Sequence, residues 1–310
     1  MLGQGFPVRV RAHTGPAAWR DGNVSMGVSA IDLTSINVWL DVVFSTLYIV
    51  ILIVLPIHFL ASIPVGRFRK KWILKQWPEH DEPHPAALPK IIHFQHLVMM
   101  FVLGFTGLYI RFPFFDGGRT TMRYIHYVAM VIVTLTLVWR FWYAFGSKRR
   151  DWRAFALTKA DIKSTLGVLL YYSFISNNKP HTAKYNVMQK AAYLMFALFM
   201  VMQVFCGFAL LEFWKIPLLN ITPSALLLGW WLAPLSGGLA MAVAWMRVLH
   251  YTLTWMFIIL TTIHVYLSAT EDIPVTLDFF GFGSHEEHAG EHVEVHTDGY
   301  THAPVTADAE

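Results

Sequence analysis

Five long runs of apolar residues constrain this chain more than any other feature of its sequence. They cover residues 37–63, 91–112, 124–145, 191–211 and 248–268, and their only full charges are Asp41, Arg111 and Arg140. Each run is long enough to cross a hydrocarbon core of about 30 Å as a helix. The sequence therefore predicts an all-α integral membrane protein with five spans.

Two further apolar stretches are too short or too interrupted to count as spans. Residues 166–175 follow a charged turn, so we expect an amphipathic segment on the membrane surface. Residues 226–246 are long enough, but Pro234 and the Gly237-Gly238 pair interrupt them. We expect an interfacial or re-entrant excursion there rather than a sixth span.

The basic residues are distributed unevenly among the connecting segments. Six Lys and Arg lie between the first two spans and nine follow the third, whereas the N-terminal segment holds three. Residues 271–310 hold ten of the twenty acids and no Lys or Arg, so the net charge of +4 conceals a basic body and an acidic tail. The positive-inside rule predicts a multi-pass protein of the cytoplasmic membrane, with its N-terminus outside and its C-terminus in the cytoplasm. The first 36 residues lack the apolar core of a cleavable signal peptide.

Composition limits the chemistry open to the chain. With 55% hydrophobic and 14% charged residues, it is neither a soluble globular enzyme nor a disordered chain. Its single cysteine, Cys206, excludes an intrachain disulfide framework, a thiolate zinc site, an iron–sulfur cluster held by this chain alone and a CxxCH haem attachment. We expect Cys206 to be a small apolar residue, and any redox chemistry to depend on histidine.

Two histidines share one face of the fifth span. His250 and His264 are fourteen residues apart, which is about 40° short of four full helical turns and about 21 Å along the axis. Polar groups within a membrane are costly and often functional. This geometry predicts two cofactors, one near each surface.

Each cofactor needs a second ligand at the same depth. His93 begins the second span on the inner side, level with His264, and His126 begins the third span on the outer side, level with His250. Neutral imidazoles in an apolar bundle without thiolates or carboxylates fit low-spin haem iron better than zinc or a di-iron site. We therefore predict an inner haem between His93 and His264 and an outer haem between His126 and His250. His96, one turn deeper, is the alternative to His93, and for His58 we expect packing or a hydrogen bond.

Cations and small residues accompany these histidines. Lys90, Arg123 and Arg247 each precede a predicted ligand by three residues, where they can meet a haem propionate or extend to the interface. Arg140 follows His126 by fourteen residues and is expected near the inner haem, with interfacial extension as an equal alternative. Gly104 and Gly107 lie on the face of His93 and can admit a flat macrocycle, although small residues also serve ordinary helix contacts.

Residues 88–275 resemble the dihaem cytochrome b subunits of bacterial respiratory complexes, which include the nickel–iron hydrogenase b-type cytochrome and the formate dehydrogenase gamma subunit. The similarity is carried by the segments KIIHFQHLVMMFVLGFTG, MRYIHYVAMVIVTLTLVWRFWYAF, KYNVMQKAAY and RVLHYTLTWMFIILTTIHVYLSATEDI. The resemblance implies a four-helix bundle with two b-type haems on His93, His126, His250 and His264. It also implies a menaquinone or ubiquinone site beside the inner haem, with Asn186 as a hydrogen-bond donor; capping of the fourth span is the alternative for Asn186.

Two segments depart from this resemblance. Residues 37–63 form an extra transmembrane helix after an extracytoplasmic segment at 1–36, and residues 276–310 form an acidic, His-rich cytoplasmic tail. We expect the tail to be solvated, with weak metal binding as a minor alternative.

The resemblance implies an electron-transfer subunit rather than the catalytic subunit for a primary substrate. Its partners are then the iron–sulfur subunit and catalytic large subunit of an extracytoplasmic oxidoreductase, a quinone and the lipid bilayer, with no nucleic acid. The fifth span and the YYSFIS segment favour hydrogenase, and KYNVMQK favours formate dehydrogenase next. Alternatives are a thiosulfate or polysulfide reductase subunit, a stand-alone cytochrome b561-like reductase, and a haem-free transporter or anchor.

Overall fold

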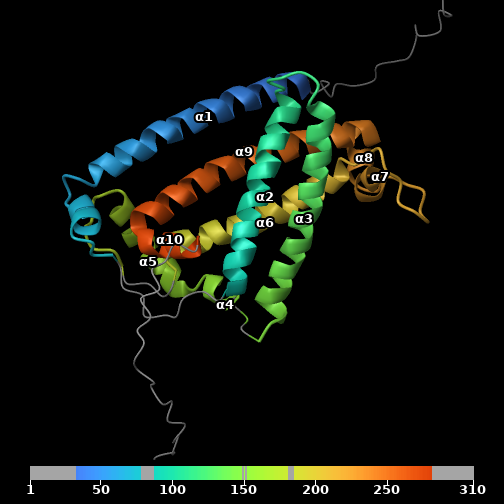
Figure 1. The fold of residues 1–310 in the computed structure, drawn as a ribbon. Coiled ribbons are helices and arrows are strands. Elements are labelled where there is room, and N and C mark those ends of the chain that lie inside the picture. Colours follow the sequence, from blue (N-terminus) through green and yellow to red (C-terminus); the bar gives the residue numbers. More distant parts are fainter. Residues whose placement is uncertain (1–32, 78–86, 149, 151, 181–184, 281–310) are drawn as a thin grey trace, which may run out of the picture.

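A computed structural model describes residues 33–77, 87–148, 150, 152–180 and 185–280. All regular structure in this part of the chain is helical (Figure 1). The elements are α1 (Leu33–Ala61), the π-helical turn η1 (Arg69–Ile73), α2 (Ala87–Arg111), α3 (Arg119–Gly146), α4 (Trp152–Phe155), α5 (Lys159–Tyr172), α6 (Val187–Ala209), α7 (Pro223–Leu228), α8 (Leu232–Ser236), α9 (Leu239–Glu271) and α10 (Ile273–Phe279).

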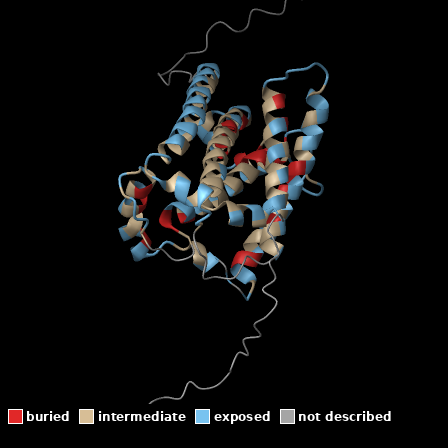
Figure 2. Cartoon of the chain, turned by 60° about the vertical axis from the view of Figure 1, so that its left-hand side comes forward, coloured by how far each residue is buried: buried red, intermediate tan, exposed pale blue. Residues whose placement is uncertain are grey.

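Within the described residues, five helices are long and apolar enough to cross a membrane, and they match the five predicted spans. These are α1, α2, α3, α6 and α9. The helices keep exposed residues along most of their length, and buried residues are confined to scattered inner positions (Figure 2). Large apolar side chains exposed on every one of the five helices suit a hydrocarbon surrounding. The chain is therefore a multi-pass membrane protein with the predicted all-α fold.

The four helices of the predicted bundle form two pairs. Helix α2 packs along α3, and α6 packs along α9; α3 and α6 make the main approach between the two pairs. In Figure 1 the α2–α3 pair crosses in front of the α6–α9 pair at a steep angle. Of the predicted ligands, His93 and His126 belong to the α2–α3 pair, and His250 and His264 belong to the α6–α9 pair. The two helix pairs make little backbone contact with each other.

Helix α1 packs chiefly against α9 and is attached near both of its ends by polar contacts. Asp41 accepts hydrogen bonds from the Arg111 guanidinium at 2.8 Å and from the Tyr251 hydroxyl at 2.5 Å. Near the other end, His58 contacts the Tyr266 hydroxyl at 2.6 Å. The extra helix is thus fixed in register against the bundle at two depths.

The segment before α9 is partly as predicted. Helices α7 and α8 are short and separate, which agrees with an excursion, but residues 239–246 belong to α9, so the fifth span begins earlier than predicted. Gly237 and Gly238 have φ of +87° and +131°, conformations that favour glycine, and they end α8 and start α9. The core where α6, α7, α8 and α9 meet includes Cys206, which is fully buried among apolar side chains.

The connection between α3 and α6 is anchored by one buried ion pair. Thr158 and Asp161 form a capping box at the start of α5, a helix that includes most of the predicted surface segment. The Lys190 ammonium group, from the first turn of α6, donates to Asp161 Oδ2 at 2.8 Å. Lys190 and the Thr158 donors lower the pKa of Asp161 from 3.8 to about 2. Asp161 thereby links α5 to the start of α6.

This ion pair predicts a loss of stability in acid. Because the pKa of Asp161 is lower in the folded state, its stabilisation is complete above about pH 4 and disappears as the pH falls toward about 2. We expect the thermal unfolding temperature of the purified protein to decrease over this interval, and Asp161→Asn to flatten that part of the profile. Unfolding of both proteins at several pH values checks this, and an unchanged profile in the variant would contradict it.

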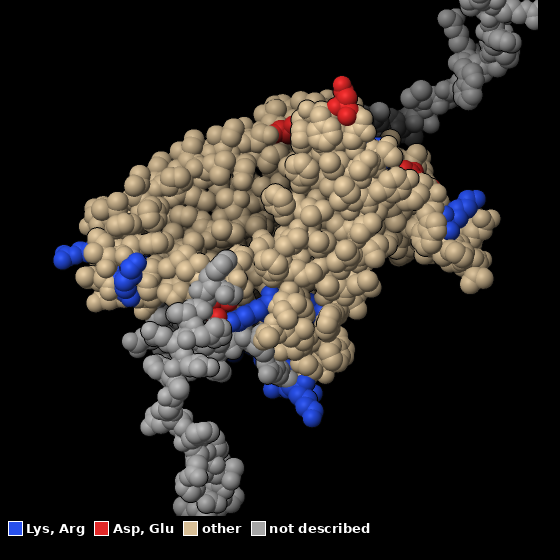
Figure 3. Space-filling view, in the orientation of Figure 1, with Lys and Arg blue, Asp and Glu red and all other residues tan. Residues whose placement is uncertain are grey.

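Charged residues lie mainly at the ends of the helices. In Figure 3 a broad uncharged band crosses the molecule, and most of the visible Lys and Arg lie toward the end that carries η1, α4 and α5. The predicted extracytoplasmic segment, apart from its last residues, and the tail beyond residue 280 lie outside the described residues. The predicted tail also begins inside a helix, because α10 extends to Phe279.

Candidate functional site

The predicted outer ligands lie face to face. The ring centroids of His126 on α3 and His250 on α9 are 6.3 Å apart. With metal–nitrogen bonds of about 2.0 Å on each side, two imidazoles that share one metal have ring centres about 6 Å apart. The ring planes are inclined at 67°, which does not prevent ligation because imidazole lone pairs lie in the ring plane. The spacing of this pair fits a six-coordinate iron.

Hydrogen-bonding residues orient both outer histidines. The Thr106 hydroxyl on α2 contacts His126 Nδ1 at 2.8 Å. Gln203 Nε2 on α6 lies 3.4 Å from His250 Nε2 and donates to the backbone oxygen of His250 at 3.2 Å. Contacts of this kind hold the rings of metal-ligating histidines in place.

Two glycines border the same pair. A Cβ added at Gly107 would meet the His126 ring at 3.4 Å, and one added at Gly207 would meet the Met130 sulfur at 3.1 Å and the His250 ring at 3.9 Å. At Gly104 an added Cβ would meet nothing within 4 Å. The chain therefore keeps side-chain volume away from both outer imidazoles.

The predicted inner ligands lie in the same part of the bundle. His93 on α2 and His264 on α9 are close enough to interact electrostatically. His264 lies beside the rings of Tyr193 and Phe196 from α6, at 6.1 and 5.6 Å between centroids, and His93 contacts the ring of Phe279 on α10 at 5.3 Å. Aromatic side chains from two further helices thus surround the inner pair.

His96, the alternative inner ligand, has a different environment. Its Nε2 atom contacts the Thr136 hydroxyl on α3 at 3.2 Å. Arg140, also on α3, lies near enough to His96 to interact electrostatically, which places this cation at the inner depth. His96 is thus a hydrogen-bonded neighbour of α3, and the choice of His93 as the partner of His264 stays a prediction.

Asn186 has the capping geometry that was the alternative to a quinone contact. Its side-chain oxygen accepts from Gln189 N at 3.0 Å, and Gln189 Oε1 accepts from Asn186 N at 2.9 Å. Asn186 Nδ2 also contacts the Tyr172 hydroxyl at 3.4 Å, and the side chain is buried. Asn186 therefore starts α6, and its contact with a quinone stays a prediction.

Two cations expected near haem propionates have protein partners. Lys90 forms an ion pair with Asp278 of α10 at 2.6 Å, and Arg247 pairs with Glu212 at 3.1 Å. The sequence spacing did not reveal these pairs because both acids are distant in the chain.

His58 has the hydrogen-bonding role expected of it, with Tyr266 and the backbone oxygen of Tyr172 as partners.

The donor set suits a haem. Among the described side chains, His250 Nδ1 is buried without a hydrogen-bond partner, which leaves an unsatisfied ring nitrogen beside a second imidazole. No group of three or more metal-binding side chains occurs in the same part of the chain, so a zinc or di-iron cage is not supported there. Paired imidazoles between glycines and aromatic rings match a planar macrocycle.

The close approach of Gly107 to His126 gives a graded prediction. Gly107→Ala places its methyl group at van der Waals distance and should leave haem binding nearly unchanged, whereas Gly107→Leu must displace the ring. We expect the leucine variant to lose most of the outer haem, and the pyridine haemochrome content of both purified variants checks this. Equal haem content in the two variants would contradict it.

Sequence reasoning missed Thr106, Gln203 and Gly207. Thr106 belongs to the Thr-Gly pair of the second span, but its bond to His126 crosses to another helix. Gln203 is the most polar residue within the fourth apolar run, and this polarity is a usable signal because such residues seldom lie in a membrane without a partner. Gly207 has the signal of a small residue among large ones.

Comparison with known proteins identifies the family of the chain. No curated protein and no solved structure matches the chain significantly. The sequence profile of the family described as prokaryotic cytochrome b561 matches residues 86–280, which include α2, α3, α6, α9 and every predicted haem ligand, and exclude α1. The chain therefore belongs to the prokaryotic cytochrome b561 family and is a membrane cytochrome of the b type that transfers electrons.

Proposed function

We propose that the chain binds two b-type haems and connects an extracytoplasmic iron–sulfur oxidoreductase with the membrane quinone pool. The observation that carries this proposal is the ring contact of His126 with His250, and the electrostatic interaction of His93 with His264 supports it. Fourteen residues of α9 separate the two sets by about 21 Å, which spreads them across much of the hydrocarbon core.

The chain's own residues hold and shield the two sites. Each haem would be held by one imidazole from the α2–α3 pair and one from α9, and when bound it supplies reversible one-electron chemistry of its iron. Thr106 and Gln203 orient the outer imidazoles, and Tyr193 and Phe196 exclude water from His264. The proposed bundle covers residues 88–275, with α1 added to it.

The chain lacks the cysteines that would hold an iron–sulfur cluster, and this bears on the choice of partner enzyme. With one cysteine, it holds no iron–sulfur cluster by itself, so such a cluster would come from the partner's iron–sulfur subunit. We favour a hydrogenase, with formate dehydrogenase next, on the segments that resemble those subunits. A thiosulfate or polysulfide reductase would use the same haems with electrons moving outward from the quinol.

The orientation is part of the proposal. The basic connections after α1 and after α3 favour the cytoplasm, which places the Asp41 end of α1 and the His126–His250 pair near the outer surface. The inner pair and any quinone site beside it then lie near the cytoplasmic surface.

Spectroscopy and gentle purification test this proposal. We expect a b-type α band in the reduced-minus-oxidised spectrum, about two haems per chain by pyridine haemochrome, and co-purification of an iron–sulfur protein identified by mass spectrometry. A missing α band would overturn the haem assignment. With the band present and no iron–sulfur partner, a stand-alone cytochrome b561-like reductase would be favoured.

A further inference from the structure

A cluster of three polar side chains joins α1, α2 and α9 close to the outer histidine pair. Arg111, the last residue of α2, donates to both carboxylate oxygens of Asp41 on α1, at 2.9 and 2.8 Å. Its guanidinium also lies over the ring of Tyr251 on α9, 4.1 Å from the ring centroid. The Tyr251 hydroxyl donates to Asp41 Oδ1 at 2.5 Å, so each member of the cluster contacts the other two. In Figure 1 the first part of α1 lies beside the end of α2.

The cluster adjoins both predicted outer ligands. Arg111 is four residues, or about one turn, beyond Gly107 on α2, and a Cβ at Gly107 would meet the His126 ring at 3.4 Å. One turn is about 6 Å, so the guanidinium lies roughly 10 Å from the outer pair. Tyr251 directly follows His250 on α9 and is turned from it by about 100°, so it faces α1 while His250 faces α3.

Asp41 joins the two helix pairs that supply the outer ligands. Helices α2 and α3 pack together, as do α6 and α9, but the two pairs make little backbone contact with each other. The Asp41 carboxylate accepts hydrogen bonds from Arg111 of the first pair and from Tyr251 of the second. It therefore limits the separation of the two pairs at the depth where His126 and His250 would share one iron.

The Asp41–Arg111 ion pair is more withdrawn from water than the Glu212–Arg247 ion pair at the same end of the bundle. Its acidic and basic side chains are 30% and 28% exposed, against 50% and 64% for Glu212 and Arg247. Among the described side-chain atoms, Arg111 Nε is buried without a hydrogen-bond partner. Water and salt screen charges in such a setting only weakly, so these charges act on a nearby redox centre.

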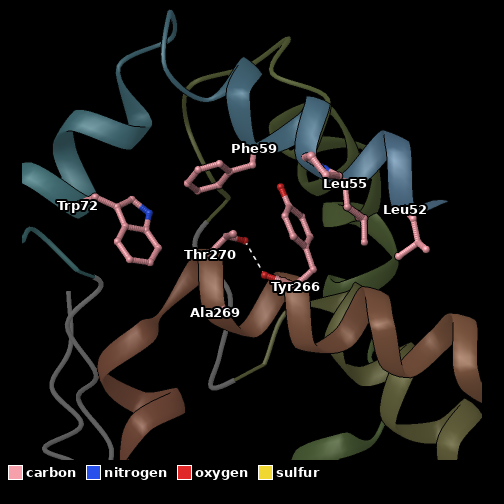
Figure 4. A pocket seen from close by; sticks show the side chains of 8 residues that line it. Leu52, Leu55, Phe59, Trp72, Tyr266, Ala269 and Thr270 are labelled. Atoms are coloured by element: carbon pink, nitrogen blue, oxygen red, sulfur yellow. Dashed lines mark hydrogen bonds between the residues drawn. The ribbon is translucent and has the colours of Figure 1, made fainter. Parts of the chain in front are cut away.

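Helix α1 brings a full charge to this end of the bundle alone. Asp41 is the one Asp, Glu, Lys or Arg within α1. At the other end, the space between α1 and α9 is lined by apolar side chains such as Leu52 and Phe59, with Tyr266 pointing from α9 toward α1 (Figure 4). Helix α1 also lies outside residues 86–280, which match the family profile. The Asp41 carboxylate therefore comes from outside the segment that matches the family.

We propose that Asp41 is a positioning residue of the outer haem site, which holds the two helix pairs at the separation that the ligands need and cancels the charge of Arg111 beside the haem. The inference rests on the proposed outer haem between His126 and His250. A positive charge near a haem favours the reduced iron, which carries one positive charge less, so an uncompensated Arg111 raises the potential of the outer haem. Helix α1 is therefore part of the outer haem site.

Redox titration of the full-length haem-loaded protein, followed by the α bands, tests this assignment. Asp41→Asn keeps an oxygen that accepts from Arg111 but removes the negative charge. The one-electron equilibrium of the outer haem should then shift about tenfold toward the reduced form, a rise of about 59 mV. Arg111→Gln removes the positive charge and should lower the potential by a similar amount, and the double variant should return close to the wild-type value. The inner haem is the internal reference and should not shift.

Glu212→Gln is the matched control for the loss of one negative charge. Glu212 is the exposed partner of Arg247, which precedes His250 by three residues. Its replacement should shift the outer haem equilibrium by less than about twofold, and the shift should vanish in about 1 M salt. The shift caused by Asp41→Asn should persist at the same salt concentration.

A further variant separates the position of the ligands from the charge. Asp41→Ala removes the acceptor as well as the charge, so it should also change the low-spin EPR signal of the outer haem, which Asp41→Asn should preserve. If a single variant loses the outer haem, the Asp41→Asn, Arg111→Gln double variant should regain it, because it leaves no unpaired charge. Shifts of the same sign in the two single variants, equal shifts of both haems, or no rescue would overturn the inference. An outer haem missing from the wild-type protein would instead overturn the proposed function.

Discussion

Replacement of His250 by alanine is expected to abolish the outer haem while the inner haem stays bound. His250 faces His126 at 6.3 Å between ring centroids, and no other histidine among the described residues contacts that pair. The haem content should fall from about two per chain to about one, because a single remaining imidazole does not retain low-spin iron in this pocket. Pyridine haemochrome analysis and a low-temperature α band, in which two haems are commonly resolved, measure the loss.

A control variant on α9, the helix that carries His250, distinguishes the loss of a ligand from a general disturbance of the helix. Thr252→Val is two residues away and loses only a hydrogen bond to its own helix backbone, so both haems should remain. His126→Ala should reproduce the spectrum of His250→Ala, because the two side chains serve one iron. Loss of different haems in the two variants would refute the pairing.

Replacement of His93 by alanine is expected to remove the inner haem, whereas His96→Ala should keep it. His93 lies close enough to His264 to interact with it electrostatically, while His96 makes a hydrogen bond with Thr136. Both variants lose an imidazole from the same helix, so they are matched in bulk and position. The effect of the His93 change should equal that of His264→Ala and leave the α band of the outer haem in place.

The opposite result has a clear meaning. If His96→Ala abolishes the inner α band and His93→Ala does not, then the second span must rotate relative to α9 on haem binding. In that case the Thr136 contact is a property of the chain before haem binding. Redox titration of the His96 variant adds a graded measure, since the loss of a neighbouring polar group should shift the inner haem potential without removing the haem.

Hydropathy was enough to predict the five spanning helices because a membrane helix must satisfy its own backbone and cover it with apolar side chains. The histidine positions were predictable because helical periodicity places fourteen-residue neighbours on one face. The same periodicity could not show that Lys90 pairs with Asp278, since that contact depends on where α10 lies after α9. Nor could it show that α9 begins at Leu239, because apolar residues before and after Gly238 look alike in composition.

Asn186 shows a different limit of prediction from the sequence. The KYN segment carries a family resemblance, yet a residue that starts a helix and one that binds a ligand have the same sequence signal. Only the reciprocal bonds between Asn186 and Gln189 reveal that the side-chain oxygen is already occupied. Similarly, the sequence could not show that His58 meets Tyr266, because 208 residues separate the two side chains.

The Asp41 cluster has a consequence for how the protein is made. Asp41 precedes Arg111 by 70 residues and Tyr251 by 210, so α1 leaves the ribosome long before either partner exists. An unpaired Asp costs about 3 kcal/mol at the centre of a membrane helix. Asp41 lies toward one end of α1, and the rest of this helix is strongly apolar, so α1 tolerates its carboxylate. Arg111 then neutralises that carboxylate when the second helix inserts, and Tyr251 joins them only with the fifth. We therefore expect the charge of Asp41 to be compensated in two steps during synthesis, first by Arg111 of α2 and then by Tyr251 of α9.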